Sequence, residues 1–586
     1  MLGQTWRPRL DESGLQRALA LSQAHGFDDL LARVLAARNV DSRSCLAYLD
    51  PSLRDLLPDP DTLTDMGAAV ERLETAISRR ESIAILGDYD VDGATASALL
   101  AEYLGGAGLE CRIHIPDRLR EGYGPSLEAV RAIAAAGASL LVTVDCGSGS
   151  HTALDEAGRL GLDTIVIDHH GIALPFPRAQ AIVNPNRPDD LSGLGSLCAA
   201  GVVFMVLVGL NRALKQRGFW SGRAAPDLLA GLDLVALGTV ADVVPLVGLN
   251  RAFVAKGLRL MRSRTRIGLA ALFDVAGASG PPTAFQLGFL VGPRINAGGR
   301  IGDAALGARL LMSRDEPEAR RLAAELDGLN RDRRHIEAVA LEEAEAEAVK
   351  ALEAEADAPV LVAAQDGWHP GIVGLVAARL RERYGRPAFA IALSQGIGTG
   401  SGRSIVGADL GRAVRTCVER GLLHKGGGHA MAAGITIEAS RIEDFRTFLT
   451  EHFSTDVARL RGADSLVVDA TLSAGAATSE LVLGLEAAGP FGSASPEPMV
   501  VLPDHRIVDL AAAGEDHLRL TLASRDGTRL RAIAFRAART ALAAGLGATR
   551  GQLVHCAGTL SLDRWGGGLR PELRLVDAAP AAIRQP

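Results

Sequence analysis

The sequence predicts a multidomain α/β protein: a doubly wound parallel-sheet domain, a long connecting helix, a second α/β domain and a C-terminal β-barrel. Three observations carry this prediction. The length of 586 residues corresponds to about four domains of ordinary size. Short apolar strands alternate with helices and Gly-rich turns between residues 82 and 167, which is typical of a parallel sheet. Near the C-terminus, apolar and polar residues alternate as in a β-hairpin.

The first elements follow in order along the chain. Residues 1–65 predict a helical leader with Pro-rich connections. The alternation then predicts strands at 82–86, 111–115, 140–144 and 164–167, separated by helices at 94–104, 127–136 and 151–160. Apolar helices follow to about residue 270. This order of elements predicts a sheet with helices on both faces.

The second half of the chain begins with one long charged helix, residues 315–357. Its part 337–357 holds eight acidic residues and one lysine, and its apolar stripe is mostly alanine, so we expect a solvated connector. A second α/β segment follows, with a strand at 360–363, a helix at 372–384, a strand at 388–393 and then Gly-rich loops. Alternation on both sides of the Asp526-Gly527 turn predicts a hairpin, with further strands at 554–562 and 573–576.

The composition excludes several classes of protein. The net charge of −7 argues against a nucleic-acid binder, but residues 337–357 alone carry −7, so the rest of the chain is neutral overall. The six cysteines form no C-x-x-C pair, which excludes a disulfide framework and a thiolate zinc site. No Gly-Lys dipeptide marks a P-loop. The first ten residues lack the apolar core of a signal peptide and the apolar run 197–210 is short for a membrane span, so we expect a cytoplasmic protein.

Acidic residues and histidines follow the predicted strands. These residues are Asp88, Asp90, Asp92, Asp145, Asp168, His169 and His170, and Asp242 lies in a later apolar segment. Taken singly, each has an ordinary explanation as an acidic turn, a helix N-cap or a core histidine. Ligands bind outside the carboxyl ends of strands in open α/β sheets, so together they predict a site for two divalent cations. Carboxylates and imidazoles without thiolates favour Mn²⁺ or Mg²⁺.

The order Asp-x-Asp, Asp, Asp-His-His, Asp resembles the DHH phosphoesterase family. Residues 292–302 resemble the Arg-rich motif of RecJ-type nucleases, and residues 400–404 and 426–434 resemble the two signatures of the DHH-associated domain. The C-terminal region resembles an OB-fold. The resemblance covers about residues 65–577. After the helical leader at 1–65, it implies a DHH catalytic domain at 66–314, a connecting helix at 315–358, a DHH-associated domain at 359–455 and an OB-fold domain at 460–586.

The resemblance also implies a role for each residue of the cluster. Asp88 ligates one metal, Asp145 bridges, and Asp90, His169 and Asp242 hold the other metal. His170 faces the scissile phosphate, Asp168 orients a neighbouring histidine, and Asp92 supports the loop. Some relatives carry a histidine two residues before the first aspartate, where this chain has Leu86.

Gly-rich segments and arginines predict a site for a 5′-phosphate or the nucleic-acid backbone, facing the metals. Glycines let backbone N–H groups approach an anion closely. The expected substrate-binding residues are Arg294, Asn296, Arg300, Ser401, Arg403, Ser404, Gly427, Gly428, His429, Tyr123 and Trp368, with Trp565 as a further base-stacking residue. The alternative is that the glycines form tight turns, the arginines are solvated and the aromatic residues pack in cores.

By resemblance, the expected function is a single-stranded-DNA-specific exonuclease that degrades 5′→3′ to 5′-mononucleotides by two-metal phosphodiester hydrolysis, in DNA repair and recombination. Single-stranded DNA, a helicase and a single-strand-binding protein are expected partners of a monomer, without a membrane. One alternative is a DHH phosphodiesterase on short oligonucleotides or cyclic dinucleotides, although such substrates need no OB-fold. Another is a non-catalytic single-strand-binding relative, although retention of the metal-ligating residues argues against it.

Overall fold

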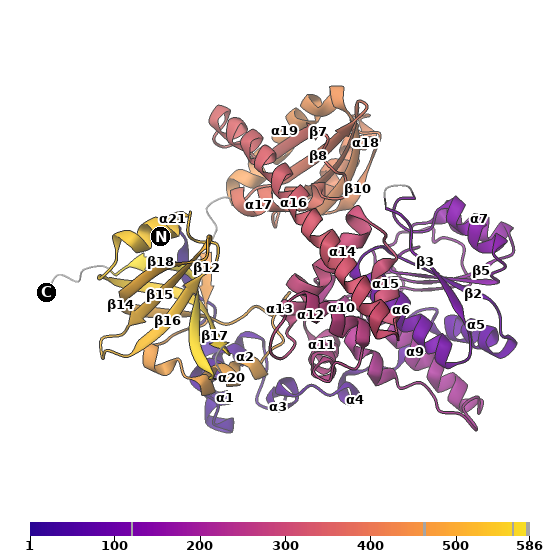
Figure 1. Cartoon of the computed structure of the whole chain (residues 1–586), viewed down its shortest axis with the longest axis horizontal. Coiled ribbons are helices and arrows are strands. Elements are labelled where there is room, and N and C mark those ends of the chain that lie inside the picture. The colour runs from indigo at the N-terminus through magenta and orange to yellow at the C-terminus, as the bar shows by residue number, and fades with distance from the viewer. Residues whose placement is uncertain (119–120, 461–464, 565–567, 582–586) are drawn as a thin grey trace.

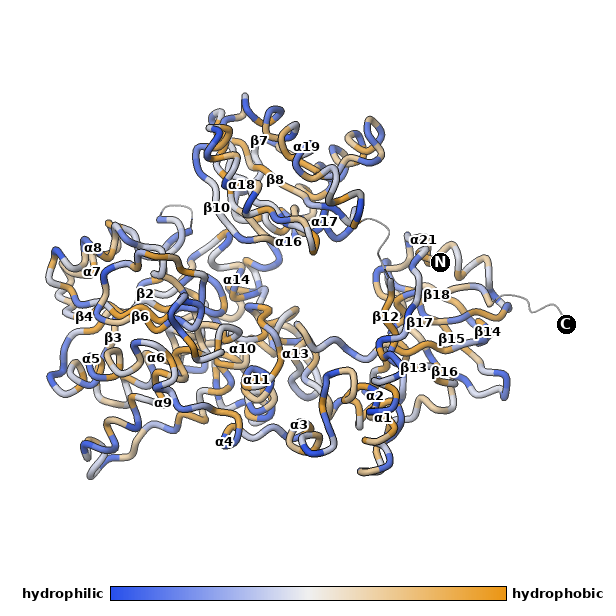
Figure 2. The backbone as a smooth tube through the Cα atoms, turned by 180° about the vertical axis from the view of Figure 1, so that it is seen from behind, coloured by the Kyte–Doolittle hydropathy of each residue, from blue (hydrophilic) through white to orange (hydrophobic). Residues whose placement is uncertain are grey.

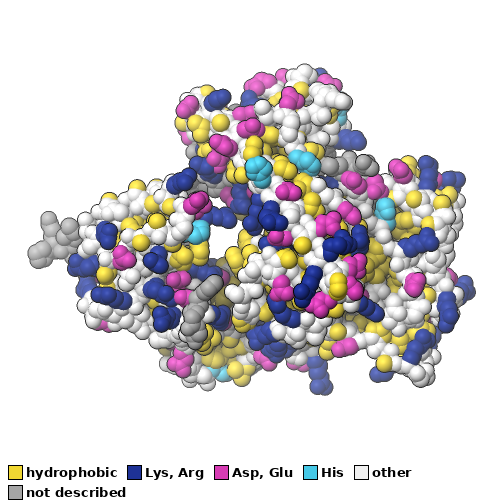
Figure 3. Space-filling view, in the orientation of Figure 1, with side chains coloured by type: hydrophobic (Ala, Val, Ile, Leu, Met, Phe, Trp, Pro, Cys, Tyr) yellow, Lys and Arg dark blue, Asp and Glu magenta, His cyan; other side chains and the backbone are white. Residues whose placement is uncertain are grey.

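The structure is a computed structural model and describes residues 1–118, 121–460, 465–564 and 568–581. Three units are arranged around an opening (Figure 1): a first α/β unit (residues 66–312), a second α/β unit (residues 361–460) and a barrel unit (residues 1–49 and 465–581). Figure 2 shows hydrophobic segments concentrated inside each unit. In the space-filling view a hollow lies between the barrel unit and the first α/β unit (Figure 3).

The first α/β unit is built on a parallel sheet of five strands. Its strands are β2 (Ile83–Gly87), β3 (Cys111–His114), β4 (Leu140–Val144), β5 (Asp163–Ile167) and β6 (Ala181–Val183). They lie in the order β3-β2-β4-β5-β6 and all neighbouring pairs are parallel, as the sequence predicts, except that β6 was not expected. The direction of strand order reverses between β2 and β4, and such a switch point is where open α/β sheets bind ligands.

Helices cover both faces of this sheet and extend the unit toward the barrel. They are α5 (Met66–Arg79), α6 (Val91–Gly106), α7 (Leu127–Ala135), α8 (His151–Arg159), α9 (Ala199–Gln216), α10 (Leu232–Ala241), α11 (Gly248–Met261), α12 (Ile267–Val275), α13 (Ala284–Gln286), α14 (Gly292–Ile301) and α15 (Leu306–Met312). Among the described residues, α9 alone is long and apolar enough to cross a membrane, and 67% of that helix is buried. It packs against α5, α6 and α10 in the core, so the expected buried helix is confirmed.

The connecting helix α16 (Glu316–Ala354) is a single helix, as predicted, but it is less solvated than its sequence indicates. Its first half contributes Leu322 and Leu326 to the core of the first α/β unit. The alanine stripe of its second half, Ala340, Ala344 and Ala348, is buried against the second α/β unit. The small alanine side chains allow this close approach of α16 to its neighbours. The helix therefore belongs to two cores and fixes the two α/β units to each other.

The second α/β unit corrects the prediction of Gly-rich loops. It contains β7 (Leu361–Asp366), β8 (Ala388–Ser394), β9 (Ile397–Arg403), β10 (Lys425–His429), β11 (Ala432–Glu438), α17 (Val373–Tyr384), α18 (Leu410–Glu419) and α19 (Ile442–Leu460). The Gly-rich segments are strands β9 and β10. A Cβ atom on Gly402 would lie 2.5 Å from the Phe389 ring, and one on Gly398 would lie 2.6 Å from Ile391. Glycine therefore alternates along β9 because the neighbouring strand's large side chains occupy its inner face.

The barrel unit combines the two ends of the chain. Its C-terminal elements are β12 (Ser465–Val468), β13 (Ala470–Thr471), α20 (Ser479–Ala487), β14 (Met499–Ala513), β15 (His517–Ala523), β16 (Arg529–Ala534), α21 (Ala541–Ala548), β17 (Leu553–Asp563) and β18 (Arg570–Pro580). Strands β14, β15, β16, β18 and β17 pair in this order, and β17 pairs again with β14. The sheet is thus a closed five-stranded barrel. Along the chain α21 lies between β16 and β17, and the predicted β15–β16 hairpin is present.

The N-terminal leader is not a separate domain in the structure. Its elements are β1 (Thr5–Pro8), α1 (Glu12–His25), α2 (Asp29–Ala37), α3 (Cys45–Leu49) and α4 (Leu53–Leu56). Strand β1 pairs with β12, and α1 and α2 share the barrel's hydrophobic core. The barrel unit also touches the first α/β unit, where Leu246 N donates to Ser493 O at 2.9 Å and Arg251 donates to the carbonyls of Tyr48 and Gly489.

Candidate metal centre

The predicted acidic residues and histidines meet at the carboxyl edge of the first sheet. Asp88 directly follows β2, Asp90 caps α6 by accepting from Gly93 N at 3.0 Å, and Asp145 directly follows β4. Asp145 adopts a left-handed backbone conformation with φ of 61°, which a non-glycine residue adopts mostly at turns and functional sites. The position of this edge at the switch point of the strand order explains why residues distant in sequence converge there.

The ligand atoms form overlapping groups. One atom each from Asp88, Asp90 and Asp145 lies within 4.8 Å of the others, and the same holds for Asp92, His169 and Asp242. Asp145 also joins the two histidines in a third such group. His169 Nε2 lies 3.2 Å from Asp145 Oδ1 and 3.6 Å from Asp242 Oδ2. Asp145 therefore lies between the two groups of ligand atoms.

The electrostatics of this cluster favour bound cations. Burial, reinforced by the neighbouring carboxylates, raises the pKa of Asp88 and Asp145 well above the ordinary value and that of Asp242 to about 8. Asp88 Oδ1, Asp145 Oδ1 and His169 Nε2 are buried and have no hydrogen-bond partner among the described residues. Unpartnered buried carboxylates are costly, and oxygen and imidazole ligands suit Mn²⁺ or Mg²⁺. The residues present therefore fit two divalent cations.

His170 lies beside this cluster and is held by Asp168. Its Nδ1 lies 2.8 Å from Asp168 Oδ1, and the same carboxylate accepts from the backbone of Ser148, His169 and His170. Burial opposes protonation of His170, but the Asp168 carboxylate raises its pKa to about 9. The Tyr123 hydroxyl donates to Asp145 O at 3.0 Å and lies 3.1 Å from His170 Nδ1. Tyr123 is thus attached to the metal cluster through its hydroxyl, while its ring stays half exposed.

Asp92 is fixed differently from the other carboxylates. Its two oxygens accept from the backbone of Ala199 at 2.6 Å and Ala200 at 3.0 Å, the first residues of α9. Its Oδ2 lies 3.9 Å from His169 Nε2. Asp92 therefore anchors the N-terminus of α9 to the cluster, whereas the sequence predicted only that it supports its own loop.

Three arginines gather where α14 approaches the second α/β unit. Arg300 Nη1 donates to Gly371 O at 3.1 Å, Arg403 Nη1 donates to Ser401 Oγ at 2.8 Å, and Arg118 lies over the Tyr89 ring at 5.1 Å. Burial and the other arginines lower the pKa of Arg300 to about 10 and also lower that of Arg403. Figure 3 shows basic side chains near this junction. Arg118 was missed from sequence, because an arginine between a strand and a helix carries no local signal.

Other predicted substrate residues lie elsewhere. Arg294 is only 7% exposed and pairs with Asp327 at 2.9 Å, and Trp368 is 7% exposed in the core with its Nε1 donating to Glu343 at 2.7 Å. The Ser404 hydroxyl donates to Ala408 O at 2.5 Å and is buried. Arg294 and Trp368 thus join the first and the second α/β unit to helix α16, whereas the Ser404 hydrogen bond stays within the second α/β unit.

The remaining predicted residues stay accessible. Gly427, Gly428 and His429 are exposed on β10, and Asn296 is half-buried on α14. Trp565 lies outside the described residues.

Replacing Trp368 by phenylalanine tests its assignment to the core. The change removes the hydrogen bond to the Glu343 carboxylate, so we expect a loss of about 1.5–3 kcal/mol in the free energy of unfolding. The Michaelis constant for a nucleic-acid substrate should stay unchanged. Denaturant unfolding and steady-state kinetics of the same preparation measure both. A raised Michaelis constant at unchanged stability would instead place Trp368 in the substrate site.

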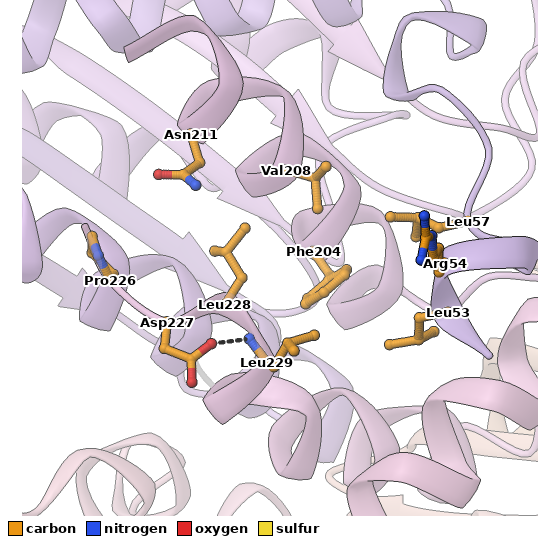
Figure 4. Close-up of a pocket in the computed structure, with 10 residues that line it drawn as sticks. All are labelled: Leu53, Arg54, Leu57, Phe204, Val208, Asn211, Pro226, Asp227, Leu228 and Leu229. Carbon is orange, nitrogen blue, oxygen red and sulfur yellow. Dashed lines mark hydrogen bonds between the residues drawn. The ribbon is translucent and has the colours of Figure 1, made fainter. Parts of the chain in front are cut away.

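A pocket of about 400 Å³ lies away from the metal cluster, between α4, α9 and the short helix η2 (Leu228–Gly231). Its walls are mainly apolar, with Phe204 and Leu228 pointing into it (Figure 4). The Asp227 carboxylate at its rim accepts from Leu229 N at 3.0 Å and so caps η2. Among the described residues that line the pocket, Arg54 and Asp227 alone are titratable, and a single pair of this kind does not form a catalytic group.

Family models match three parts of the chain: the N-terminal domain of the DHH family at residues 82–239, the DHHA1 domain at 357–455 and the RecJ OB domain at 468–577. A single-stranded-DNA-specific exonuclease RecJ of Dickeya dadantii is 40% identical over 505 residues, which cover 84% of this chain and 86% of that protein. The chain belongs to the RecJ family.

Further relatives extend this result. The single-stranded-DNA-specific exonuclease RecJ of Escherichia coli is 38% identical over 508 residues, covering 84% of this chain and 86% of that RecJ protein. A crystal structure of RecJ with Mn²⁺ from Thermus thermophilus superposes with a TM-score of 0.79 at 30% identity and covers 99% of this chain and 80% of that chain. The expected resemblance to RecJ-type nucleases, and with it the multidomain DHH fold, is confirmed.

Proposed function

We propose that this chain is a single-stranded-DNA-specific exonuclease that degrades its substrate 5′→3′ to 5′-mononucleotides with two divalent cations, Mn²⁺ or Mg²⁺, in DNA repair and recombination. The observation that carries the proposal is the combination of a fitted two-cation centre with an arginine cluster beside it. The similarity to RecJ exonucleases over 84% of the chain supports this substrate. The closed barrel supports binding of a strand rather than a dinucleotide.

The residues of the centre have separate tasks in phosphodiester hydrolysis. Bound cations supply an activated water nucleophile and neutralise charge at the phosphate. Asp88, Asp90, His169 and Asp242 would hold them, and Asp145, between the two groups of ligand atoms, would be shared by both cations. Asp168 fixes the ring of His170, which lies beside the cluster and offers its other ring nitrogen to a phosphate oxygen.

The arginine cluster suits recognition of a 5′-terminal phosphate. Its guanidinium groups repel one another. Arg300 and Arg403 lie at the N-terminal end of α17, which attracts anions. A Cβ atom on Gly374 would lie 3.0 Å from Arg403 Nη2 and 3.2 Å from Ser401 Oγ, so glycine keeps this space open. A terminal phosphate carries more negative charge than an internal diester. Selection of that end by the cluster explains exonucleolytic action from the 5′ side.

The remaining parts of the proposal concern the cellular setting. We place the protein in the cytoplasm, in keeping with its bacterial relatives, as a monomer, because the arginines and the metal centre come from the same chain. A helicase that separates duplex DNA and a single-strand-binding protein that covers the product are the proposed partners. Size-exclusion chromatography with light scattering tests the monomer.

Replacing Arg403 by glutamine tests the proposed polarity. Because one charge-assisted contact to the phosphate is lost, we expect kcat/KM on a 5′-phosphorylated strand to fall about 10–100-fold. The same strand with a 5′-hydroxyl should be affected much less. The matched control is Arg415→Gln, an exposed arginine on α18 of the same unit. An equal loss on both strands would contradict recognition of the 5′ end.

A substrate panel separates this proposal from its alternatives. Single-stranded DNA, duplex DNA and a cyclic dinucleotide are incubated with Mn²⁺ or with EDTA. Stepwise degradation of the single strand alone, abolished by EDTA, is the expected result. A preference for the cyclic dinucleotide, or strand binding without cleavage in any metal, would overturn it.

A further inference from the structure

The backbone of the two histidines after β5 is fixed by side chains. His169 and His170 lie outside any helix or strand, and the Asp168 carboxylate accepts from both of their N–H groups, at 2.7 and 3.1 Å. Asn186 Nδ2 donates to His169 O at 2.6 Å. Asn184 Nδ2 donates to His170 O at 2.9 Å. Backbone groups that no secondary structure pairs need such partners, so both peptide units are held on the N–H side and on the carbonyl side.

Asn184 is fully buried and uses both ends of its amide. Besides the histidine carbonyl, its Nδ2 donates to Ser148 Oγ at 2.8 Å, and its Oδ1 accepts from Asn186 N at 2.8 Å. Ser148 N in turn donates to Asp168 Oδ2 at 3.1 Å, so Asn184 and Asp168 belong to one network. An aspartate of the same shape would have no hydrogen to donate when ionised. The contacts therefore require an amide at this position.

Asn186 is exposed, but its surroundings are equally well defined. Its Nδ2 also donates to Gly195 O at 3.0 Å. A Cβ atom on Gly195 would lie 2.5 Å from Asn186 Oδ1, so glycine leaves room for the amide. The neighbouring Arg187 is 8% exposed and donates to Asp65 Oδ2 and to Ile182 O, both at 2.7 Å. The segment after β6 is thus anchored where it reaches the histidines.

We propose that Asn184 and Asn186 are positioning residues of the metal centre, with Asn186 orienting His169 toward the cations and Asn184 orienting His170 toward the phosphate. The inference rests on the proposed function for the task of His170 and adds the two asparagines to it. A histidine ring is joined to the backbone by two bonds, so a shift of the peptide unit displaces the ring nitrogens directly. Groups that orient a metal ligand commonly change metal affinity or activity when they are replaced.

Replacing Asn186 by alanine tests the effect on the cations. The variant should fold, because Asn186 is exposed. We expect the apparent dissociation constant of Mn²⁺, measured without DNA from the paramagnetic resonance of the free ion, to rise about tenfold. Saturating Mn²⁺ should restore kcat. The control Gln216→Ala, an exposed amide at the end of α9 in the same unit, should leave Mn²⁺ binding unchanged, and equal Mn²⁺ binding by Asn186→Ala and the unsubstituted protein would overturn the inference.

Replacing Asn184 by alanine tests the effect on His170. At saturating Mn²⁺ we expect kcat on single-stranded DNA to fall about 10–100-fold, with a nearly unchanged dissociation constant of Mn²⁺. In a His170→Ala background the same substitution should cause no further loss, because its effect passes through His170. An equal loss of kcat with and without His170 would overturn the inference. If Asn184→Ala does not fold, the Mn²⁺ affinity of Asn186→Ala decides alone.

The two proposals can fail separately. The Mn²⁺ titration contains no DNA, so its outcome does not depend on the exonuclease function. Failure of that function would show as absence of cleavage by the unsubstituted protein.

Discussion

Replacing Asp145 by asparagine is expected to lower kcat on single-stranded DNA by on the order of 10³-fold. Loss of the proposed bridging ligand would remove several kcal/mol of charge stabilisation at the phosphate, and about 1.4 kcal/mol corresponds to a factor of ten. Asp145 and His169 are each shared by two of the three groups of ligand atoms. Among the described residues, Asp145 is the one carboxylate that belongs to two of these groups. Single-turnover cleavage of a 5′-phosphorylated strand at saturating Mn²⁺ measures the loss.

The same variant separates chemistry from folding. Removing a buried charge from a cluster of carboxylates relieves repulsion, so in EDTA we expect the melting temperature of Asp145→Asn to equal or exceed that of the unsubstituted protein. Asp155→Asn, an exposed carboxylate on α8 of the same unit, serves as the matched control and should retain full activity. Activity of Asp145→Asn within tenfold of the unsubstituted protein would contradict the bridging role.

The metal centre was predictable because its residues carry a local signal. An apolar strand followed by an acidic residue can be recognised in the sequence, and in a parallel sheet the carboxyl ends of such strands share one edge. Asp88, Asp145 and His169 therefore meet as expected. For residues outside this pattern, the sequence does not indicate whether a side chain points into a core or toward the substrate site. Trp368 and Arg294 lie in motifs of the right spacing, but tertiary packing buries both.

Contacts between residues distant in sequence explain the other differences between the predicted and the observed structure. Strand β1 pairs with β12, more than 450 residues away, and nothing in the local composition of the leader indicates such a partner. The Gly-rich strand β9 resembles a loop in sequence, since glycine disfavours strands in general. Only the Phe389 and Ile391 side chains of the neighbouring strand show why glycine is required there. Arg118 joins Arg300 and Arg403 through the tertiary fold alone.

The acidic segment of α16 illustrates how net charge misleads. Its acids are not all solvated: Glu343 accepts from Trp368, Glu347 accepts from Ala364 N at 3.1 Å, and Glu345 pairs with Arg383. These contacts fix the second α/β unit to the helix and with it the position of Arg403. Acidic residues of α16 therefore help to hold the arginine cluster in place. The net negative charge of the chain does not argue against a nucleic-acid substrate.

Removing the metals should make the stability of the first α/β unit strongly dependent on pH. The pKa of Asp242 is raised from 3.8 to about 8 by burial and by the neighbouring carboxylates Asp92 and Asp90. Between these two values the folded state binds more protons than the unfolded state, so in EDTA stability is fully present below about pH 4 and decreases as the pH rises toward about 8. Asp88 and Asp145 act in the same direction.

The size of this effect follows from Asp242 alone. Between pH 5 and pH 8 the ionisation of Asp242 lowers the free energy of unfolding by about 4 kcal/mol. At about 2–4 °C per kcal/mol, the melting temperature in EDTA should fall by roughly 10 °C. Excess Mn²⁺ should oppose the fall, because the ionised carboxylates bind the cation and the bound form is stabilised by mass action. Calorimetry at several pH values with EDTA or Mn²⁺ measures the difference, which should widen with pH. In Asp242→Asn the melting temperature in EDTA should depend less on pH, since asparagine does not ionise. A melting temperature in EDTA that rises from pH 5 to pH 8 would contradict a cluster that needs cations to hold its charge.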